Sequence, residues 1–468
     1  LLVQTSPAPT AATSPSPSGV ILQKRQSVRL FILNRPEALN ALNLGMVYNM
    51  TPQLEAWQDS DLCKVIVLKN TEGDKAFCAG GDVKNIILQA KSGKLEDVAK
   101  SIKFFEEEYR LNHLLGTLNK PFVSIMNGIT MGGGVGLSVH APFRIATEKT
   151  LFAMPETSIG LFPDVGGSFF LPRLDGELGT YLGLTGNRLK GEEVFFAGIA
   201  THFIPSERIP LLLERLAELE TQEIEVVNIA IEDFVGELLC SLDKWRNWSL
   251  GGEVAEAIDR CFKFDTIEEI VQALENEKTP WAEKQLATLK SVSPTSLKVT
   301  LMQLRKGRQA HFAEAFKMEY QMVKEFLQTP DFYEGVTAKL IDKPARAPKW
   351  HPSWEEMNLL EPRTVEQMFF PTREEIQAQP KPDSTYYDYP HRPLSSLPSV
   401  DDIRRVIRGM RLQGRTFKLH RVCALFLILT DSRNDSSSTS PPSSNVNTPR
   451  QGPARGNSGS AEDEGRSR

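Results

Sequence analysis

The chain has 468 residues, a net charge of −5 and a sequence pI near 6.0, and 40% of its residues are hydrophobic. This length favours more than one structural unit, and the apolar content is sufficient for a sizeable core. The acidic balance argues against general nucleic-acid affinity, so we expect no nucleic acid as a partner. Five cysteines without a Cys-x-x-Cys pair predict neither a disulfide framework nor a zinc–thiolate site.

Both ends of the chain have compositions that bury little apolar surface. Residues 1–19 are rich in Ser, Thr, Pro and Ala, and residues 431–468 are rich in Ser, Pro, Asn and Gly. We expect both segments to be disordered. The apolar run at 422–430 has about half the length of a membrane-spanning helix, so we expect no membrane partner.

The region up to residue 204 combines short strands, glycine turns and helices. Apolar runs rich in β-branched residues predict buried strands, at 20–22, 28–33, 64–69, 121–126, 143–146 and 151–154. Apolar positions at helical spacing predict helices, at 43–59, 83–88, 95–118, 135–140, 164–171, 176–184 and 190–197. This order of elements predicts an α/β core.

Beyond residue 204 the β-branched strands and glycine turns become scarce. Helical spacing dominates instead, at 211–219, 224–239, 267–275, 282–290, 294–307 and 312–327. The sequence therefore predicts a second, mainly helical region after the α/β core.

Two segments have the order strand, glycine turn, helix. One contains Phe77-Cys-Ala-Gly-Gly-Asp82 and the other Gly128-Ile-Thr-Met-Gly-Gly-Gly-Val-Gly136. Such turns leave free backbone N–H groups at a helix start. Two of them could each direct one N–H at a single oxygen and form an oxyanion hole. Two unrelated tight turns in an α/β domain would give the same pattern.

Acidic residues lie between the two turns and after the second one. Glu156 follows a proline at a strand end, and Asp164 precedes Val-Gly-Gly. Either could be a general base, a nucleophile or a proton donor. Equally, Glu156 could be a surface acid and Asp164 a helix N-cap. In the cluster Glu106-Glu-Glu108, three adjacent helical positions cannot all face solvent, so one acid may point inward.

Three segments together, FCAGGD, NGITMGGGVGLS and FAMPETSIGLFPDVGG, resemble the crotonase superfamily and, within it, the branch that hydrolyses 3-hydroxyisobutyryl-CoA. The resemblance covers roughly residues 25–355. It implies an α/β fold, a spiral of strand-strand-helix units followed by a mainly helical C-terminal region. The implied organisation is a disordered segment, a catalytic core, a helical region and a poorly matched, largely disordered tail, at 1–19, 20–204, 205–355 and 356–468.

The resemblance also implies an activity and its residues. The activity is thioester hydrolysis of 3-hydroxyisobutyryl-CoA in valine breakdown, in mitochondria. The N–H groups of Gly81 and Gly133 would form the oxyanion hole, and Glu156 and Asp164 would be the acid/base or nucleophilic carboxylates. Glu108, placed directly before a tyrosine, would face the substrate, with Gly133, Glu156 and Asp164 also contacting it. No cofactor is implied, since CoA is part of the substrate, and no metal. The oligomeric state is left open.

Two other functions remain open at this stage. The hydratase branch of the superfamily uses a second glutamate three residues after the middle glycine, a position held here by Gly136. The absence of a carboxylate there favours a hydrolase over a hydratase or isomerase. A non-catalytic acyl-CoA-binding or scaffolding protein is the other alternative.

The loop Asn34-Arg-Pro-Glu-Ala-Leu-Asn-Ala-Leu42 resembles the superfamily's opening segment, which borders the CoA nucleotide, but it is also an ordinary strand-to-helix loop.

Overall fold

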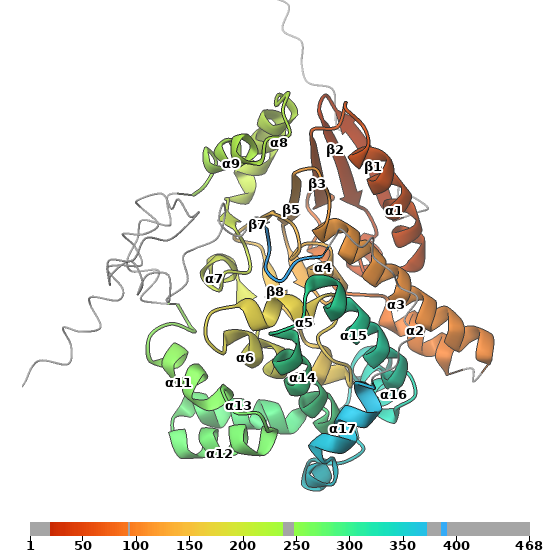
Figure 1. Cartoon of the computed structure of the whole chain (residues 1–468), viewed down its shortest axis with the longest axis vertical. Coiled ribbons are helices and arrows are strands. Elements are labelled where there is room, and N and C mark those ends of the chain that lie inside the picture. The colour runs from red at the N-terminus through yellow and green to blue at the C-terminus, as the bar shows by residue number, and fades with distance from the viewer. Residues whose placement is uncertain (1–18, 92–93, 237–247, 372–384, 391–468) are drawn as a thin grey trace, which may run out of the picture. The chain divides into compact units, whose positions relative to one another are not determined.

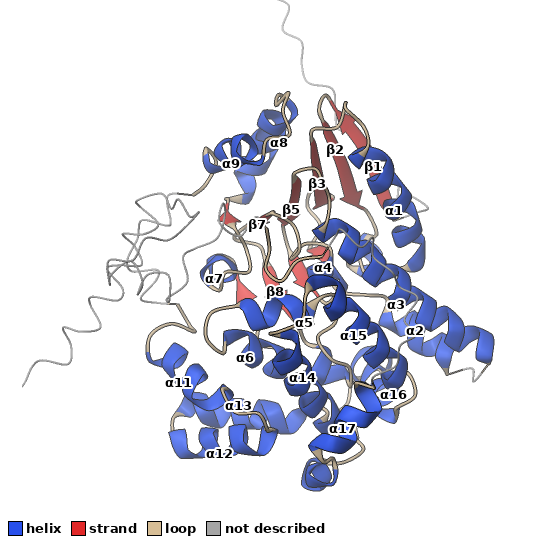
Figure 2. Ribbon diagram, viewed as in Figure 1, coloured by secondary structure: helices blue, strands red, loops and turns tan. Residues whose placement is uncertain are grey.

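The chain forms two β-sheets followed by a mainly helical region (Figures 1 and 2). The structure is a computed structural model that describes residues 19–91, 94–236, 248–371 and 385–390. All of them belong to one compact unit, which spans residues 1–428.

The larger sheet has six strands in the order β1-β2-β3-β5-β7-β10. Neighbouring strands are parallel, except that β1 and β2 form an antiparallel pair. All residues of β5 are buried, as expected for a parallel strand covered on both faces. The strands are β1 (Val20–Arg25), β2 (Val28–Leu33), β3 (Val65–Asn70), β5 (Phe122–Met126), β7 (Phe143–Ala146) and β10 (His202–Phe203).

The smaller sheet has four strands in the order β4-β6-β8-β9, of which β4, β6 and β8 are parallel. From β3 to β8, consecutive strands of the chain alternate between the two sheets. Because parallel strands end at the same edge of a sheet, the turns after β4, β6 and β8 lie side by side. The strands are β4 (Ala76–Cys78), β6 (Ile129–Met131), β8 (Leu151–Ala153) and β9 (Leu189–Lys190).

Helices follow these strands, as the sequence predicts. They are η1 (Pro36–Ala38), α1 (Leu44–Gln58), α2 (Val83–Ala90), α3 (Leu95–Gly116), α4 (Gly133–Gly136), η2 (Glu156–Ile159), α5 (Gly167–Phe170), η3 (Leu171–Arg173), α6 (Leu178–Thr185), α7 (Glu192–Phe196) and η4 (Ser206–Arg208). Four of these helices begin two or more residues from the predicted position, and two of the four, α6 and α7, begin two residues late. Helix α4 begins two residues early, because Gly132 turns the chain at φ +44°. Helix α5 begins at Gly167, since Val165 and Gly166 adopt left-handed angles.

The region after residue 204 is helical in the parts that the structure describes. Its helices are α8 (Ile209–Ala217), α9 (Ile224–Glu232), α11 (Glu253–Phe262), α12 (Ile267–Glu277), α13 (Pro280–Ser291), α14 (Pro294–Gly307), α15 (Phe312–Phe326), α16 (Pro330–Val336), η6 (Thr337–Ile341), η7 (Trp354–Leu359) and α17 (Pro362–Phe369). Local sequence sets several starts. Thr279 and Ser293 cap α13 and α14 through their side chains, and a proline occupies the first position of each helix.

The helical region shares its core with the α/β region. One cluster of buried side chains includes Tyr109, Phe169, Phe316 and Val336, which come from both regions. The residue-204 boundary therefore separates two kinds of secondary structure and not two separately packed cores.

The predicted tail from residue 356 onward differs from expectation at its beginning. Helix α17 lies inside it and buries Val365 and Phe369 against the core, and residues 385–390 also pack on the core. The prediction missed both because the resemblance ends near residue 355. Of the segment expected to be disordered at 1–19, residues 1–18 lie outside the described residues, and Gly19 is buried and accepts a hydrogen bond from the N–H of Asn34. Residues 431–468 and the apolar run at 422–430 also lie outside the described residues.

Candidate active site

The turns after β4, β6 and β8 bring Gly81, Gly133 and Glu156 to one edge of the smaller sheet. The first two turns touch directly. A Cβ added to Gly134 would collide with the carbonyl of Cys78 at the end of β4. Only a glycine allows this approach of two backbones, and the contact explains the third glycine of the triplet.

The N–H groups of Gly81 and Gly133 are close to one another. The nitrogen of Gly81 lies 3.1 Å from the point where a Cβ on Gly133 would stand. Gly133 is the first residue of α4, so no carbonyl of that helix can accept its N–H. The bridge between Leu42 and Gly81 uses the N–H groups of Leu42 and Asp82, which leaves the N–H of Gly81 outside it. The two N–H groups are therefore neighbours that these backbone contacts do not use, and their role as an oxyanion hole stays a prediction.

The loop before α1 supports the first of these turns. Leu39 and Leu42 exchange backbone hydrogen bonds with residues 79–82. The Arg35 guanidinium forms an ion pair with Asp82 at 2.8 Å. The segment with resemblance to the superfamily's opening therefore holds the glycine turn in place; its expected role beside a nucleotide stays a prediction.

Two glutamates face the second glycine turn. A Cβ added to Gly133 would lie 2.5 Å from Oε1 of Glu108, and one added to Gly132 would lie 2.8 Å from Oε1 of Glu156. The two residues are 2% and 5% exposed. Oε1 of Glu108 and Oε2 of Glu156 have no hydrogen-bond partner among the described residues. These carboxyl groups therefore lie beside the candidate oxyanion hole with oxygens free to interact with a substrate.

Only one of the three adjacent glutamates on helix α3 points into the core. Glu106 and Glu107 form ion pairs with Lys103 and Arg110 on the outer side of the helix, and Glu108 is buried. The prediction that one acid points inward is confirmed, and the inward residue is the one placed before Tyr109.

Asp164 completes a cluster of three carboxyl groups. It is 5% exposed, and its Oδ2 accepts a hydrogen bond from the hydroxyl of Tyr109 at 2.8 Å. Helix α5 begins at Gly167 with Gly166 as its N-cap residue, so Asp164 does not cap it. Glu156 is likewise buried, which excludes the surface-acid interpretation. The sequence had left both alternatives open.

Burial raises the pKa of all three carboxyl groups. Lost hydration raises the pKa of Asp164 to about 7, against the lowering effect of the Tyr109 hydrogen bond. Burial, and then the negative charge of Asp164, raises the pKa of Glu156 and of Glu108 well above the usual range. Three neighbouring buried carboxyls cannot all be ionised at neutral pH. The cluster therefore retains at least one proton at neutral pH.

Side chains from the helical region hold the loop that carries Asp164. Glu319 on α15 accepts the N–H groups of Gly166 and Ser168 at 2.7 and 2.8 Å. Gln303 on α14 donates to the carbonyl of Pro163 at 2.6 Å. The sequence analysis missed Tyr109, Glu319 and Gln303. For Glu319 and Gln303, the signal in the sequence was an acid or amide on the apolar face of a predicted helix.

His140 also holds the loop that carries Asp164. Its Nε2 lies 2.8 Å from the carbonyl of Val165, and its Nδ1 lies 2.7 Å from the hydroxyl of Tyr389. A carbonyl only accepts, so Nε2 carries the proton and Nδ1 accepts from the tyrosine. Burial lowers the pKa of His140 to about 3, which keeps the ring neutral. Tyr389, in the segment 385–390, is thus linked by hydrogen bonds through His140 to the loop that carries Asp164.

Other polar groups do not offer an alternative site. Burial raises the pKa of Cys78 to about 12, so this thiol is not a ready nucleophile. Among the described residues, no three His, Cys, Asp or Glu side chains are grouped as metal ligands would be. Within the same ranges, the helices are too short or too polar to span a membrane.

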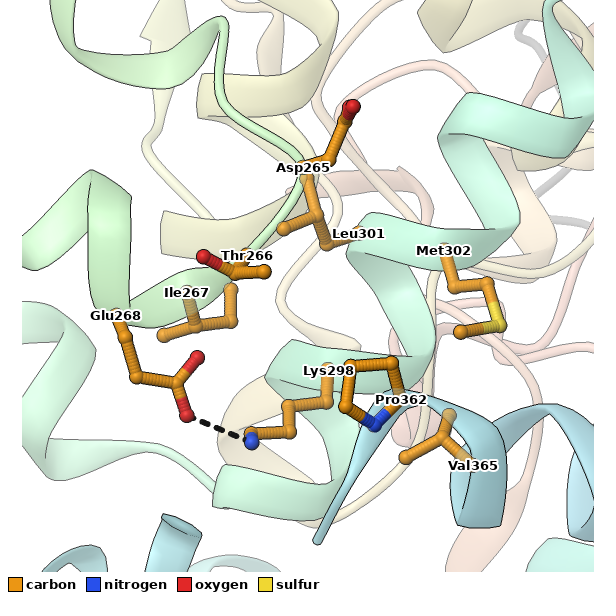
Figure 3. A pocket seen from close by; sticks show the side chains of 9 residues that line it. All are labelled: Asp265, Thr266, Ile267, Glu268, Lys298, Leu301, Met302, Pro362 and Val365. Carbon is orange, nitrogen blue, oxygen red and sulfur yellow. Dashed lines mark ion pairs between the residues drawn. The ribbon is translucent and has the colours of Figure 1, made fainter.

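A small cleft lies elsewhere, between α12, α14 and α17 (Figure 3). Lys298 and Glu268 form an ion pair across it at 2.7 Å, and Lys298 also donates to the carbonyl of Leu360. The cleft shares no residue with the carboxyl cluster, and its cation is already paired. It is therefore not the candidate active site.

The chain is similar to several known proteins. A mitochondrial 3-hydroxyisobutyryl-CoA hydrolase of Danio rerio is 48% identical over 341 residues, which cover 73% of this chain and 87% of the relative. Small ribosomal subunit protein mS47 of Neurospora crassa is 45% identical over 405 residues, which cover 84% of this chain and 79% of the relative.

A solved structure of a carnitinyl-CoA dehydratase from Mycobacterium thermoresistibile has a TM-score of 0.67 at 33% identity. The match covers 76% of this chain and 98% of the other, and it confirms the predicted crotonase-like fold class. The sequence model for enoyl-CoA hydratase/isomerase matches residues 28–369, which include both glycine turns and all three buried carboxyl groups. The chain belongs to the enoyl-CoA hydratase/isomerase family.

Proposed function

We propose that the protein hydrolyses the thioester of 3-hydroxyisobutyryl-CoA to 3-hydroxyisobutyrate and free CoA. The observation that carries this proposal is the cluster of Glu108, Glu156 and Asp164 beside the N–H groups of Gly81 and Gly133. The relative from Danio rerio bears this activity in its name. The groups of the site match the chemical needs of acyl transfer to water.

In the proposed mechanism, Gly81 and Gly133 bind the thioester oxygen as it becomes negatively charged. Glu156 faces Gly132 with its Oε1, and its Oε2 has no hydrogen-bond partner among the described residues. It accepts a proton from the attacking water, or it attacks the carbonyl carbon itself to form an acyl anhydride that water then hydrolyses. A C–O bond forms and the C–S bond breaks. Asp164 positions the acyl group or returns the proton to the leaving thiolate.

The same residues argue against hydration of a double bond. That reaction needs two acid/base groups, and Gly136 provides no side chain for the second. An added Cβ there would stand 2.6 Å from Cβ of Val165, so the position is filled by neighbouring groups. We therefore place hydrolase activity above hydratase or isomerase activity.

We expect no cofactor, because backbone donors and carboxyl groups are sufficient for this chemistry and CoA is part of the substrate. Hydrolysis should continue unchanged in the presence of a metal chelator. We also propose a mitochondrial location, as the names of the relatives suggest, and a place in valine breakdown.

The test is release of free thiol by the purified protein from 3-hydroxyisobutyryl-CoA and from a 2-enoyl-CoA. We expect thiol release from the first compound and no hydration of the second. Hydration without thiol release would overturn the proposal in favour of a hydratase.

A second candidate function has its own observation. The relative named small ribosomal subunit protein mS47 matches 84% of this chain, a larger share than the 73% matched by the Danio rerio hydrolase. We propose a ribosomal role as the alternative to, or companion of, catalysis. Sedimentation of a mitochondrial extract tests it: co-migration of the protein with the small subunit at high salt would support the role, and migration only as free protein would reject it.

A further inference from the structure

Helix α3 presents a fourth polar side chain beside the carboxyl cluster. Asn112 lies one helical turn after Glu108 and three residues after Tyr109, so these residues share one face of the helix. Asn112 is fully buried, with 0% of its surface exposed. Neither its amide nitrogen nor its amide oxygen has a hydrogen-bond partner among the described residues.

The missing side chain at Gly136 makes room for this amide. A Cβ added to Gly136 would stand 2.8 Å from Oδ1 and 2.9 Å from Nδ2 of Asn112. The same Cβ would stand 2.6 Å from Cβ of Val165, the residue after Asp164. The carboxamide therefore lies between α3, α4 and the Asp164 loop. It contacts the C-terminal end of α4, three residues after Gly133.

A buried carboxamide without partners is unfavourable unless something fills both of its hydrogen-bonding roles. The partner must accept from Nδ2 and donate to Oδ1, or consist of two groups that do so. Neighbouring Glu108 and Glu156 are themselves incompletely paired. The unmatched atoms thus belong to one region, the surroundings of the candidate oxyanion hole.

A hydroxyl group both donates and accepts, and it is uncharged. It therefore suits a carboxamide that shares a helix face with Glu108 and lies beside the Asp164 loop, where a further anion would meet neighbouring carboxyl groups. Resting on the proposed function, we propose that Asn112 binds the 3-hydroxyl group of the acyl chain and so selects 3-hydroxyacyl thioesters over unsubstituted ones. This makes Asn112 a specificity-determining residue.

The test compares 3-hydroxyisobutyryl-CoA with isobutyryl-CoA, which lacks only the hydroxyl. The measured quantity is the ratio of the two kcat/KM values in the wild type and in Asn112→Leu, a replacement of similar size without hydrogen-bonding atoms. We expect the ratio to fall by about 10- to 100-fold, because sites that pair a substrate hydroxyl reject the analogue without it. Asn228→Leu is the control, since Oδ1 of Asn228 on α9 also lacks a partner. Its ratio should stay at the wild-type value.

An unchanged ratio in a folded Asn112→Leu protein would overturn the inference and leave Asn112 as a residue that binds an internal water. If that variant does not fold, Asn112→Ala replaces it, since the shorter side chain fits without overpacking and has no hydrogen-bonding atoms; an unchanged ratio there would have the same meaning. The wild-type assay separates the two proposals. Absence of thiol release by the wild type contradicts the proposed function, whereas wild-type activity with an unaltered ratio in the variants contradicts only the role of Asn112.

Discussion

The α/β region and the helical region contribute to the candidate site in different ways. The α/β region supplies the groups that would contact the substrate: two backbone N–H groups and three carboxyl groups, all near the edge formed by β4, β6 and β8. The helical region supplies Glu319 and Gln303, which form hydrogen bonds with the backbone of the Asp164 loop. The comparison shows how one region can hold reacting groups while another fixes their geometry.

The two kinds of contribution should have different signatures in mutants. Loss of a reacting group should lower turnover and leave the free energy of unfolding nearly unchanged. Loss of a supporting group should lower both, because the same hydrogen bonds stabilise the fold and the loop. The following predictions test this difference.

The largest effect is expected for Gly133→Ala. The added methyl group would meet Oε1 of Glu108 and the nitrogen of Gly81, and so would occupy the candidate oxyanion hole. Loss of one oxyanion donor costs about 3–4 kcal/mol of transition-state stabilisation, which should appear in kcat. The measurement is turnover together with binding of a non-hydrolysable thioester analogue, which we expect to persist.

Gly136 is unsuitable as a control for this variant, because its Cβ would strike Asn112 and Val165 inside the site. Gly183→Ala on α6 is a better match: its methyl group would lie 3.2 Å from the end of the Leu304 side chain and 3.3 Å from that of Leu171. If both variants lost activity in proportion to their lost stability, the glycines would be structural only.

The next effect is expected for Glu156→Gln and Asp164→Asn. Each change preserves size and removes one acid/base group, so turnover should fall by about a hundredfold or more. Neither variant should have a lower melting temperature, since neither leaves a cavity. Glu106→Gln, two residues before Glu108 and paired with Lys103, is the control and should behave as wild type. Near-normal turnover of Glu156→Gln would rule out the proposed mechanism.

A supporting residue should give a mixed effect. In Glu319→Gln, one backbone N–H of the Asp164 loop would face an amide NH₂ instead of an oxygen. We expect the free energy of unfolding to fall by about 1–3 kcal/mol and turnover to fall by about tenfold as Asp164 loses its position. Denaturant titration and steady-state kinetics measure the two effects. Glu325→Gln on the same helix is the control; lost activity without lost stability in Glu319→Gln would make Glu319 a reacting group.

The pH dependence of stability should distinguish Asp164 from a supporting acid. Burial raises its pKa to about 7 in the folded protein, above the usual value of 3.8. The protonated form is therefore favoured by folding, and this contribution is complete below about pH 4 and is lost as pH rises through 7. Asp164→Asn does not titrate, so its melting temperature should rise relative to wild type between pH 5 and pH 8. A constant difference across this range would contradict the raised pKa.

The smallest effect is expected for Tyr389→Phe. The change removes the hydroxyl that donates to Nδ1 of His140 and leaves the ring packed. We expect a loss of about 1 kcal/mol in the free energy of unfolding and a modest loss of turnover through the Val165 carbonyl. Tyr387→Phe, at an exposed position two residues away, is the control. Equal behaviour of both variants would show that residues 385–390 do not support the loop.

Elements that depend on nearby residues lie where the sequence predicts them, and elements that depend on distant contacts do not. The strands β2 and β5 and the helices α1, α14 and α15 lie close to their predicted ranges, because apolar periodicity and caps are local properties of the chain. The start of α5 was misplaced, since Val165 adopts an unusual left-handed conformation. That conformation is held by contacts from His140 and Glu319, which lie far away in sequence.

The sequence by itself determined the α/β-then-helical order, the two glycine turns and the acidic residues near them, because each is a short pattern with a local physical cause. The tertiary structure alone decided that Glu108 faces inward, that Asp164 binds Tyr109 and does not cap a helix, and that Asn112 lies unpaired beside Gly136. These outcomes depend on the approach of α3, α4 and the Asp164 loop. Such approaches are fixed by the packing of the whole core, which no local pattern encodes.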